Sequence, residues 1–459
     1  MIVFPGWDLR RRLGVPRLSA STRSRLAMAE SYYRGVRPWI LVREEDAVLI
    51  APPNRVYKLG GSALGLLGWL DSGNHLVEAC REEGKAKEAL EFFEALRAAC
   101  EGRASAEGFG RVPYDFDFTR LPILGEIALT YRCNERCRFC YALCGPAGAS
   151  GASSSPSTEE LSTEAWKNVI RVFKEEAKIP FFSFTGGEPL MREDLEELAA
   201  YARDLGLRVN LITNGSLATR ERAASLKASG IDSAQVSLES PDARVHDALV
   251  DIEGAWDRTI AGIEALRDAG VSVQTNSTLT AVNRESLIRL PELLCSLGVS
   301  RFSMNLFIPA GRGKTSSSAE ELFVSYSEVG PFVDGIRKEA HRAGLTFFWY
   351  SPTPYCIYNP VARGLGNKSC AAMDGLIHVD PRGGILPCSS WPESLGSLAG
   401  PSAKGFREIW FSERSDYFKR KHFAPSSCSR CGSFVACQGA CPLYWSYAGE
   451  GELRQGPRP

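Results

Sequence analysis

The alternation of short apolar segments with helical segments limits the possible folds of this 459-residue chain more than any other feature. Six apolar runs recur between residues 121 and 345: GEIALTY, FFSFT, RVNLIT, AQVSLES, VQTNSTLT and RFSMNLFI. Segments with helical periodicity, such as REDLEELAAYARDLG, separate them. Strands that alternate with helices predict βα units and a parallel sheet. We therefore predict an α/β fold whose six βα units form an open sheet or a partial barrel.

The overall composition argues against a nucleic-acid partner and against a membrane span. Lys plus Arg and Asp plus Glu both number 54, so the formal net charge is +0 and no excess basic field is available for nucleic acid. No apolar run reaches the ~18–20 residues that a membrane span needs, and the N-terminus lacks a signal-peptide pattern. We expect a cytoplasmic protein that has no nucleic-acid partner and no membrane span.

The fourteen cysteines are unevenly distributed along the chain. In a reducing compartment, clustered cysteines indicate metal ligands or catalytic thiols rather than disulfides. One loop carries Cys133, Cys137, Cys140 and Cys144. The last quarter of the chain carries Cys356, Cys370, Cys388, Cys428, Cys431, Cys437 and Cys441. Cys80, Cys100 and Cys295 stand alone in apolar contexts, where we expect buried, inert thiols.

The motif CNERCRFCY at 133–141 directly follows the first predicted strand. In α/β barrels this rim is where the chemistry is assembled. Three thiolates fit three corners of a 4Fe–4S cube and leave one iron open to a ligand. A zinc site built from the same thiols is the alternative that these residues alone leave open.

The tips of the next strands are also glycine-rich or polar. TGGEP at 185–189 follows the second strand, TNGS at 213–216 the third, and SLES at 237–240 ends the fourth. Two glycines allow a close backbone approach to a ligand, and Glu188 adds a carboxylate. Each motif alone is typical of a plain turn, but together with the cysteine motif they indicate a ligand site on one rim.

Residues 126–345 and the CxxxCxxC motif resemble the radical S-adenosylmethionine (SAM) superfamily, including the aromatic Phe139 before the last cysteine. The resemblance implies a partial (β/α)6 TIM-like barrel. It implies that Cys133, Cys137 and Cys140 hold a 4Fe–4S cluster whose open iron chelates SAM. Reductive cleavage of SAM would then give methionine and a 5′-deoxyadenosyl radical that abstracts a substrate hydrogen. No catalytic side chain is expected beyond the cluster and the SAM site.

The same resemblance implies the residues that contact SAM. Those expected to meet its amino group are Gly186, Gly187, Glu188 and Pro189. Those expected near its carboxylate and ribose are Thr213, Asn214 and Ser237. Two positions depart from the common pattern: SLES stands where relatives often read SLDG, and Val250 stands where they commonly place an arginine. The anchor for the SAM carboxylate would therefore come from elsewhere.

The cysteine-rich tail resembles the SPASM extension of peptide-modifying radical SAM enzymes, which carries auxiliary iron–sulfur clusters. The resemblance rests on the spacing of Cys370, Gly383 and Cys388 and on a C-x2-C-x5-C-x3-C run at 428–441. It implies one cluster on Cys370, Cys388 and Cys441, with Cys356 as an optional fourth ligand.

The second auxiliary set would begin with Cys428, Cys431 and Cys437, but the seventh cysteine of the full pattern is missing from the last eighteen residues. The second cluster could have an open iron or a non-cysteine ligand, or it could be absent. We thus expect one or two auxiliary 4Fe–4S clusters, with a zinc ribbon as the alternative.

The segment 38–105 resembles the small PqqD-like fold that recognises leader peptides of ribosomally made precursors. VLIAPPNRVYKLGGSALGLLGWLDSG reads as a strand, a turn and a Leu-rich helix, which predicts a winged-helix-like α+β module. Such a module can bind an extended precursor peptide by strand addition. A degenerate winged helix that only packs against the barrel is the alternative.

These patterns predict five regions: an N-terminal extension at 1–37, the PqqD-like module at 38–108, a linker at 109–120, the radical SAM barrel at 121–350 and a SPASM-like domain at 351–459. Residues 145–158 read as a mobile loop, and residues 309–318 as the last catalytic-side loop of the barrel.

The predicted activity is oxidative modification of a precursor-peptide side chain, as a cross-link, thioether or epimerisation, with an electron donor such as flavodoxin or ferredoxin. A protein substrate of the sulfatase-maturase type, a tetrapyrrole substrate, or a zinc-stapled binding protein without turnover are the alternatives.

Overall fold

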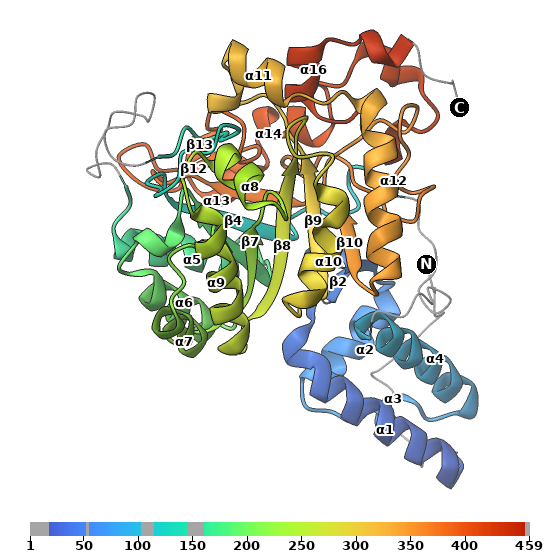
Figure 1. Ribbon diagram of the computed structural model, residues 1–459. Coiled ribbons are helices and arrows are strands. Elements are labelled where there is room, and N and C mark those ends of the chain that lie inside the picture. Colours follow the sequence, from blue (N-terminus) through green and yellow to red (C-terminus); the bar gives the residue numbers. More distant parts are fainter. Residues whose placement is uncertain (1–17, 52–54, 102–113, 146–159, 455–459) are drawn as a thin grey trace. The chain divides into compact units, whose positions relative to one another are not determined.

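The structure is a computed structural model that describes residues 18–51, 55–101, 114–145 and 160–454 (Figure 1). The chain divides into two compact units, Met1–Ile123 and Leu124–Pro459. In the described residues, no helix combines the length and the apolar character that a membrane crossing requires. Residues 109–113 of the predicted linker and nearly all of the predicted mobile loop lie outside the described residues, as do residues 52–54 of the APPN turn.

The first unit is an α+β module. Its antiparallel sheet has the order β1-β2-β3, with β1 Leu41–Arg43, β2 Val48–Ala51 and β3 Arg55–Lys58. Its helices are α1 Ala20–Val36, α2 Gly61–Asp71, α3 Leu76–Ala79 and α4 Glu83–Cys100. The predicted strand and Leu-rich helix are therefore present as β2 and α2, and a further strand, β3, lies between them.

Helix α1 belongs to the core of this unit, although the sequence placed it in an N-terminal extension. Leu26 and Tyr33 of α1 are buried in the same apolar cluster as residues of α2 and α4. The rings of Tyr33 and Phe93 meet edge to face at 5.9 Å. The Tyr33 hydroxyl also donates to the Asp71 carboxylate at 2.8 Å. The module thus needs the helix that precedes its first strand.

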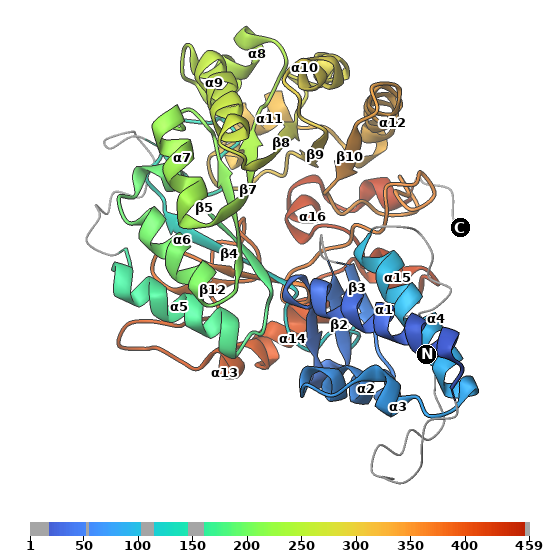
Figure 2. The same ribbon diagram turned by 90° about the horizontal axis from the view of Figure 1, so that it is seen from below.

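The second unit is built on a ten-stranded sheet with the order β10-β9-β8-β7-β6-β5-β4-β11-β12-β13. The six parallel strands at its centre are β4 Leu124–Thr130, β5 Phe181–Gly186, β6 Arg208–Thr213, β7 Ile231–Ser237, β8 Ser272–Leu279 and β9 Arg301–Leu306. All six predicted strands are confirmed, and Figure 2 shows their sheet curling into a partial barrel.

Short strands extend this sheet at both ends. β10, Thr346–Trp349, pairs in parallel with β9, and β11, Leu376–Val379, pairs in parallel with β4. β12, Gly384–Leu386, and β13, Gly396–Ser397, then continue antiparallel. The cysteine-rich region therefore contributes strands to the barrel sheet beside the strand that leads into the cysteine motif.

Helices cover the outer side of the curved sheet (Figure 2). They are α5 Thr163–Glu175, α6 Leu195–Asp204, α7 Arg220–Ser229, α9 Ala255–Asp268, α10 Leu290–Ser296 and α12 Tyr326–Arg342. The short helices α8 Ala243–Val250 and α11 Ser316–Leu322 lie instead at the carboxyl end of the strands (Figure 1). A Cβ at Gly125 of β4 would lie 2.4 Å from the Phe173 ring of α5. This contact identifies the side of β4 that faces the helices, so Glu126 faces the interior.

The tail after β13 has little regular structure. Its helices are α13 Phe406–Trp410, α14 Glu413–Lys419, α15 Phe434–Cys437 and α16 Pro442–Ala448. Tyr444 of α16 stacks on Tyr326 of α12 with ring centroids 3.7 Å apart, and its hydroxyl accepts from the Tyr326 N–H at 2.8 Å. This contact attaches the end of the tail to the last barrel helix.

Candidate metal centre

The cysteine loop that follows β4 is held from one side by the glycines of TGGEP. The Gly187 N–H donates to the Thr130 carbonyl at 2.7 Å, and the Glu188 N–H donates to the Arg132 carbonyl at 2.9 Å. A Cβ at Gly187 would lie 2.2 Å from the Arg132 carbonyl oxygen. Gly186 has φ +133°, and its Cβ would meet the Thr130 oxygen at the same distance. These glycines therefore permit a close approach to the cysteine loop itself.

The other side of the cysteine loop contacts the end of α8 and the loop after β9. The Arg136 N–H donates to the Val250 carbonyl at 3.0 Å, so the position that lacks the expected arginine contributes its backbone. Gly311 has φ +50°, and a Cβ there would lie 2.1 Å from the Tyr141 carbonyl oxygen. The predicted catalytic-side loop at 309–318 thus packs directly on the cysteine loop.

Arg312 is a supporting residue that the sequence did not single out. Its N–H donates to the Cys140 carbonyl, and its guanidinium donates to the carbonyls of Arg136 and Cys144, each at 2.8 Å. The arginines within the motif point to carboxylates instead, because Arg136 pairs with Asp251 at 3.0 Å and Arg138 pairs with Glu321. Arg312 therefore binds the cysteine loop at three of its backbone carbonyls.

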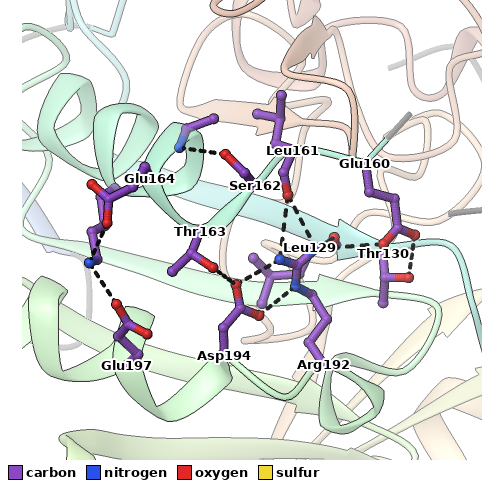
Figure 3. A network of polar contacts seen from close by, with 12 residues as sticks. Leu129, Thr130, Glu160, Leu161, Ser162, Thr163, Glu164, Arg192, Asp194 and Glu197 are labelled. Carbon is purple, nitrogen blue, oxygen red and sulfur yellow. Dashed lines mark hydrogen bonds and ion pairs between the residues drawn. The ribbon is translucent and has the colours of Figure 1, made fainter. Parts of the chain in front are cut away.

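A buried arginine, Arg192, binds the end of β4, where the cysteine loop begins (Figure 3). Arg192 forms an ion pair with Asp194 at 2.7 Å and lies 3.5 Å from Glu160, whose carboxylate accepts from the Thr130 hydroxyl at 2.6 Å. Its guanidinium also donates to the carbonyls of Leu129 and Leu161. The network joins the end of β4 to the segments before α5 and α6.

The thiols of the motif gather at the carboxyl end of β4. The buried Cys133 Sγ accepts from the Glu135 N–H at 3.4 Å, and the Asn214 side-chain amide lies 4.0 Å away. The charges of Cys133 and Cys140 both act on Cys137. Burial raises the pKa of Cys133 to about 12 and that of Cys137 well above its usual value. The three predicted ligands are therefore neighbours.

Cys144 is a fourth thiol at this place. Its N–H donates to the Cys140 Sγ at 3.3 Å. Its thiol also donates to Cys140, which lowers the pKa of Cys140 and raises that of Cys144. Cys140 and Cys144 therefore lie side by side at the end of the motif.

Three buried carboxyl groups surround these thiols. Burial raises the pKa of Glu135 to about 8, of Glu188 to about 7 and of Glu239 to about 8. The charges of Glu188 and Glu135 act on Cys133, and that of Glu239 acts on Cys137. Glu135 Oε1 is buried without a hydrogen-bond partner. A positively charged ligand would stabilise the ionised form of such groups.

Glu188 has a structural role that the sequence did not indicate. Its carboxylate accepts from the Leu190 N–H at 2.9 Å and from the Thr213 hydroxyl and the Asn214 N–H, each at 2.8 Å. It therefore fixes the tip of β6 against the segment that begins at Pro189. The Asn214 side-chain amide also donates to the Asn134 side chain at 2.9 Å.

Ser237 and Phe139, which were also predicted to contact the cofactor, lie at the edge of this group of thiols and carboxyl groups. Ser237 ends β7 and pairs with Asn276 of β8. Phe139 packs against an apolar cluster of Leu249, Phe307 and Leu322. Of the predicted SAM residues, the structure thus brings Glu188 and Asn214 near Cys133 and Thr213 onto Glu188, whereas Phe139 supports the loop by apolar packing.

The interior of the barrel is polar. The Asn210 amide donates to the Ser183 hydroxyl at 3.1 Å, and the Ser233 hydroxyl donates to Asn210 at 2.7 Å. The buried His378 Nδ1 lies 3.1 Å from the Glu126 carboxylate, and its Nε2 has no hydrogen-bond partner. No sequence pattern indicated this pair, because β11 carries no periodic pattern that would place His378 opposite β4.

The seven cysteines of the tail fall into two groups. After burial, the charges of Cys370 and Cys441 raise the pKa of the Cys388 thiol. After burial, the charges of Cys437, Cys356 and Cys431 raise the pKa of the Cys428 thiol. All fourteen cysteines are free thiols, and Cys295, which we expected to be buried, is exposed. Within the described residues, no three His, Cys, Asp or Glu side chains converge as ligands of a single metal ion.

Comparison with known proteins shows to which family the chain belongs. Residues 127–310 match the radical SAM superfamily, and residues 370–432 match an iron–sulfur cluster-binding domain, SPASM. The AdoMet-dependent heme synthase of Nitratidesulfovibrio vulgaris is 30% identical over 338 residues, which make up 70% of this chain and 88% of the relative. The chain belongs to the radical SAM superfamily.

Two further proteins are similar to this radical SAM enzyme, one in sequence and one in fold. The mycofactocin maturase MftC of Mycolicibacterium smegmatis is 30% identical over 332 residues, which cover 70% of this chain and 78% of MftC. The crystal structure of Streptococcus suis SuiB bound to the precursor peptide SuiA superposes with a TM-score of 0.65 at 18% identity. It covers 88% of this chain and 95% of SuiB, and at this identity it shows a shared fold.

Membership of this superfamily makes the chain an enzyme that uses SAM and 4Fe–4S clusters. The residues present fit both groups. Neighbouring thiols at the end of β4 are suited to cluster irons. The buried carboxyl groups around them, including the unpartnered Glu135 Oε1, suit the positive charges of SAM.

Proposed function

We propose that this radical SAM/SPASM enzyme oxidises a side chain of a ribosomally made precursor peptide, by a cross-link, a thioether, an epimerisation or a similar change. The observation that carries the proposal is the first unit, an α+β module whose three-stranded sheet ends in β1 and β3. An end strand can accept an extended peptide by strand addition, in which main-chain hydrogen bonds provide affinity.

The end strand β3 suits this role in its exposure and support. All four of its residues, Arg55–Lys58, are half-buried. The Lys58 ammonium donates to the carbonyls of Asp46 and Phe118 at 2.6 and 2.7 Å, which fixes the end of the strand. The ion pair of Arg43 and Asp46 at 2.7 Å is buried and stabilises the turn between β1 and β2. A rigid end strand lowers the entropy cost of adding a peptide strand.

Two relatives support a peptide substrate. SuiB was crystallised with a precursor peptide, and MftC is a maturase. The superposition with SuiB covers a larger share of this chain than the second unit alone represents, so it includes part of the first unit. The PqqD-like identity of the first unit is part of this proposal, with residues about 38–105 as the leader-binding segment.

The barrel would supply the chemistry. A 4Fe–4S cluster on Cys133, Cys137 and Cys140, reduced by a donor such as flavodoxin or ferredoxin, would cleave SAM and yield the 5′-deoxyadenosyl radical. Asn214 and Glu188 would orient SAM from the tip of β6, and Ser237 from the tip of β7. The polar interior around Asn210, which the sheet encloses, would hold the peptide side chain that is oxidised.

A tetrapyrrole is the second candidate substrate, because a heme synthase matches this chain at 30% identity. Sequence identity does not separate the candidates, since MftC also matches at 30% over the same share of the chain. Coverage does not separate them either, because the matches to the heme synthase and to MftC each take up 70% of this chain. What favours a peptide is the first unit, part of which is included in the superposition with SuiB.

The test compares the two substrate classes on the reconstituted, full-length enzyme under anaerobic conditions. Peptides encoded by short reading frames beside the gene, or an iron tetrapyrrole with propionate side chains, are added with SAM and dithionite. We expect a peptide product that differs in mass or chirality and that requires the leader segment. The same peptide without its leader and the Cys140→Ala enzyme are the controls. Conversion of the tetrapyrrole with no change in any peptide would contradict the proposal.

A further inference from the structure

We propose that Cys356 completes a four-cysteine site with Cys428, Cys431 and Cys437, so that this auxiliary cluster needs no cysteine downstream of Cys441. The same assignment leaves Cys370, Cys388 and Cys441 as a set of three, whose cluster would keep one iron without a cysteine ligand. The proposal concerns the ligands of the SPASM region and applies to either substrate class.

The backbone places Cys356 beside the second group of cysteines. The N–H of Tyr355, the preceding residue, donates to the Cys437 Sγ at 3.4 Å. The Tyr355 hydroxyl lies 3.3 Å from the Ala436 carbonyl and 2.7 Å from the Asn367 side chain. Main-chain and side-chain contacts thus attach the segment before Cys356 to α15, which ends at Cys437.

Local turns bring the other three members of the group together. The Cys431 N–H donates to the Cys428 carbonyl at 3.0 Å, at the end of the 3-10 helix Ser426–Arg430. The Phe434 N–H then donates to the Cys431 carbonyl at 3.0 Å and begins α15. Four thiolates are the ordinary complement of a 4Fe–4S cluster, and Cys356 supplies the member that the downstream sequence lacks.

Cys370 of the group of three is held separately, because the buried Lys421 ammonium donates to its carbonyl at 2.6 Å. The spacing of the sequence groups Cys388 and Cys441 with it. No other cysteine is left to join them, because Cys144 contacts Cys140 in the barrel and Cys80, Cys100 and Cys295 stand apart in the sequence. An iron that is open to a substrate or to a non-cysteine ligand therefore belongs to this set.

The test is iron analysis with Mössbauer and EPR spectroscopy in two variant backgrounds of the full-length protein, reconstituted anaerobically. The first background, Cys370→Ala with Cys388→Ala, removes the group of three and should keep about eight irons in two 4Fe–4S clusters. The second, Cys428→Ala with Cys431→Ala, removes the group of four and should also keep about eight. Cys295→Ala in each background is the control for a cysteine that binds nothing.

Adding Cys356→Ala should change only the first background. There we expect a loss of one to four irons or the EPR signal of a three-iron cluster, whereas the second background should keep its iron and its spectra. The reverse pattern, with iron lost only from the second background, would assign Cys356 to Cys370, Cys388 and Cys441 and overturn the proposal.

A single Cys356→Ser variant provides a second test that does not depend on the folding of the double variants. The hydroxyl keeps the size of the side chain but is a harder ligand, so the Mössbauer spectrum of one cluster should shift while the total iron stays near that of the wild type. Spectra identical to those of the wild type would also contradict the proposal.

Discussion

The cysteine loop of the barrel and the cysteine-rich tail hold their thiols by different means. In the barrel, backbone hydrogen bonds from the tips of neighbouring strands and loops fix the loop, through Gly187, Glu188 and Arg312. In the tail, the thiols lie on short helices and turns such as α15, Phe434–Cys437. The sheet thus prepares the first site before a cluster binds, whereas bound clusters must contribute much of the stability of the second region.

The largest expected effect comes from breaking the barrel site itself. Cys140→Ala removes one of three predicted ligands, so 5′-deoxyadenosine formation from SAM with dithionite should fall by more than about 100-fold, beyond the ~10–100-fold effect of losing a residue that only supports a ligand. The exposed Cys295→Ala should retain the wild-type rate. A normal rate in Cys140→Ala would place SAM cleavage elsewhere.

Substitution of Arg192 tests whether the cysteine loop of the barrel is fixed independently of its cluster. Arg192→Ala leaves the carboxylates of Asp194 and Glu160 without their buried partner, which should lower the free energy of unfolding by about 3–5 kcal/mol. The exposed Arg203, paired with Asp204, is the control, because its loss should cost about 0–1 kcal/mol. Urea titration of the anaerobic proteins measures both, and equal shifts for the two variants would show that the network does not support the barrel.

Removing the clusters should separate the two regions directly. After iron chelation, we expect limited proteolysis to cut residues 351–459 at least about tenfold faster, because that region loses its metal-derived stability. The barrel strands from β4 to β9 should remain resistant, since their packing does not depend on iron. Uniform digestion of both regions would mean that the barrel also depends on its cluster.

The smallest effect concerns the close approach at TGGEP. Gly187→Ala places a Cβ 2.2 Å from the Arg132 carbonyl oxygen and should destabilise the barrel by about 1–3 kcal/mol. Gly68→Ala, inside α2 with no atom within 4 Å of its Cβ, should be stabilising by about 0.5–1 kcal/mol. Thermal unfolding compares the two, and a neutral Gly187→Ala would show that the loop can shift without cost.

The sequence predicted the parts of the molecule that depend on local patterns. The six central strands followed from apolar runs between helical segments, and the cysteine loop followed from its position after the first of them. β10 to β13 were missed because each has at most four residues and pairs with strands far away in the sequence. Helix α1 was missed as core because its apolar residues do not form a clear stripe, and only Leu26, Glu30 and Tyr33 of the helix are buried.

The supporting side chains could not be predicted for a related reason. Arg312 and Arg192 act on backbone carbonyls, and the choice of carbonyl depends on the folded path of the chain. The pairing of His378 with Glu126 depends on the register of β11 with β4. Cys356 was expected as an optional partner of Cys370, but only the folded tail brings it to Cys437. Spacing therefore indicated the metal chemistry without settling which thiols share a cluster.

The most direct test of the account is a count of iron and sulfide in the anaerobically reconstituted protein, with SAM cleavage measured on the same sample. One cluster at the barrel and two in the tail predict about twelve irons per chain and formation of 5′-deoxyadenosine when dithionite is added. Zinc in place of iron, with no cleavage of SAM, would mean that the thiols at 133–140 form a structural site and would contradict the account.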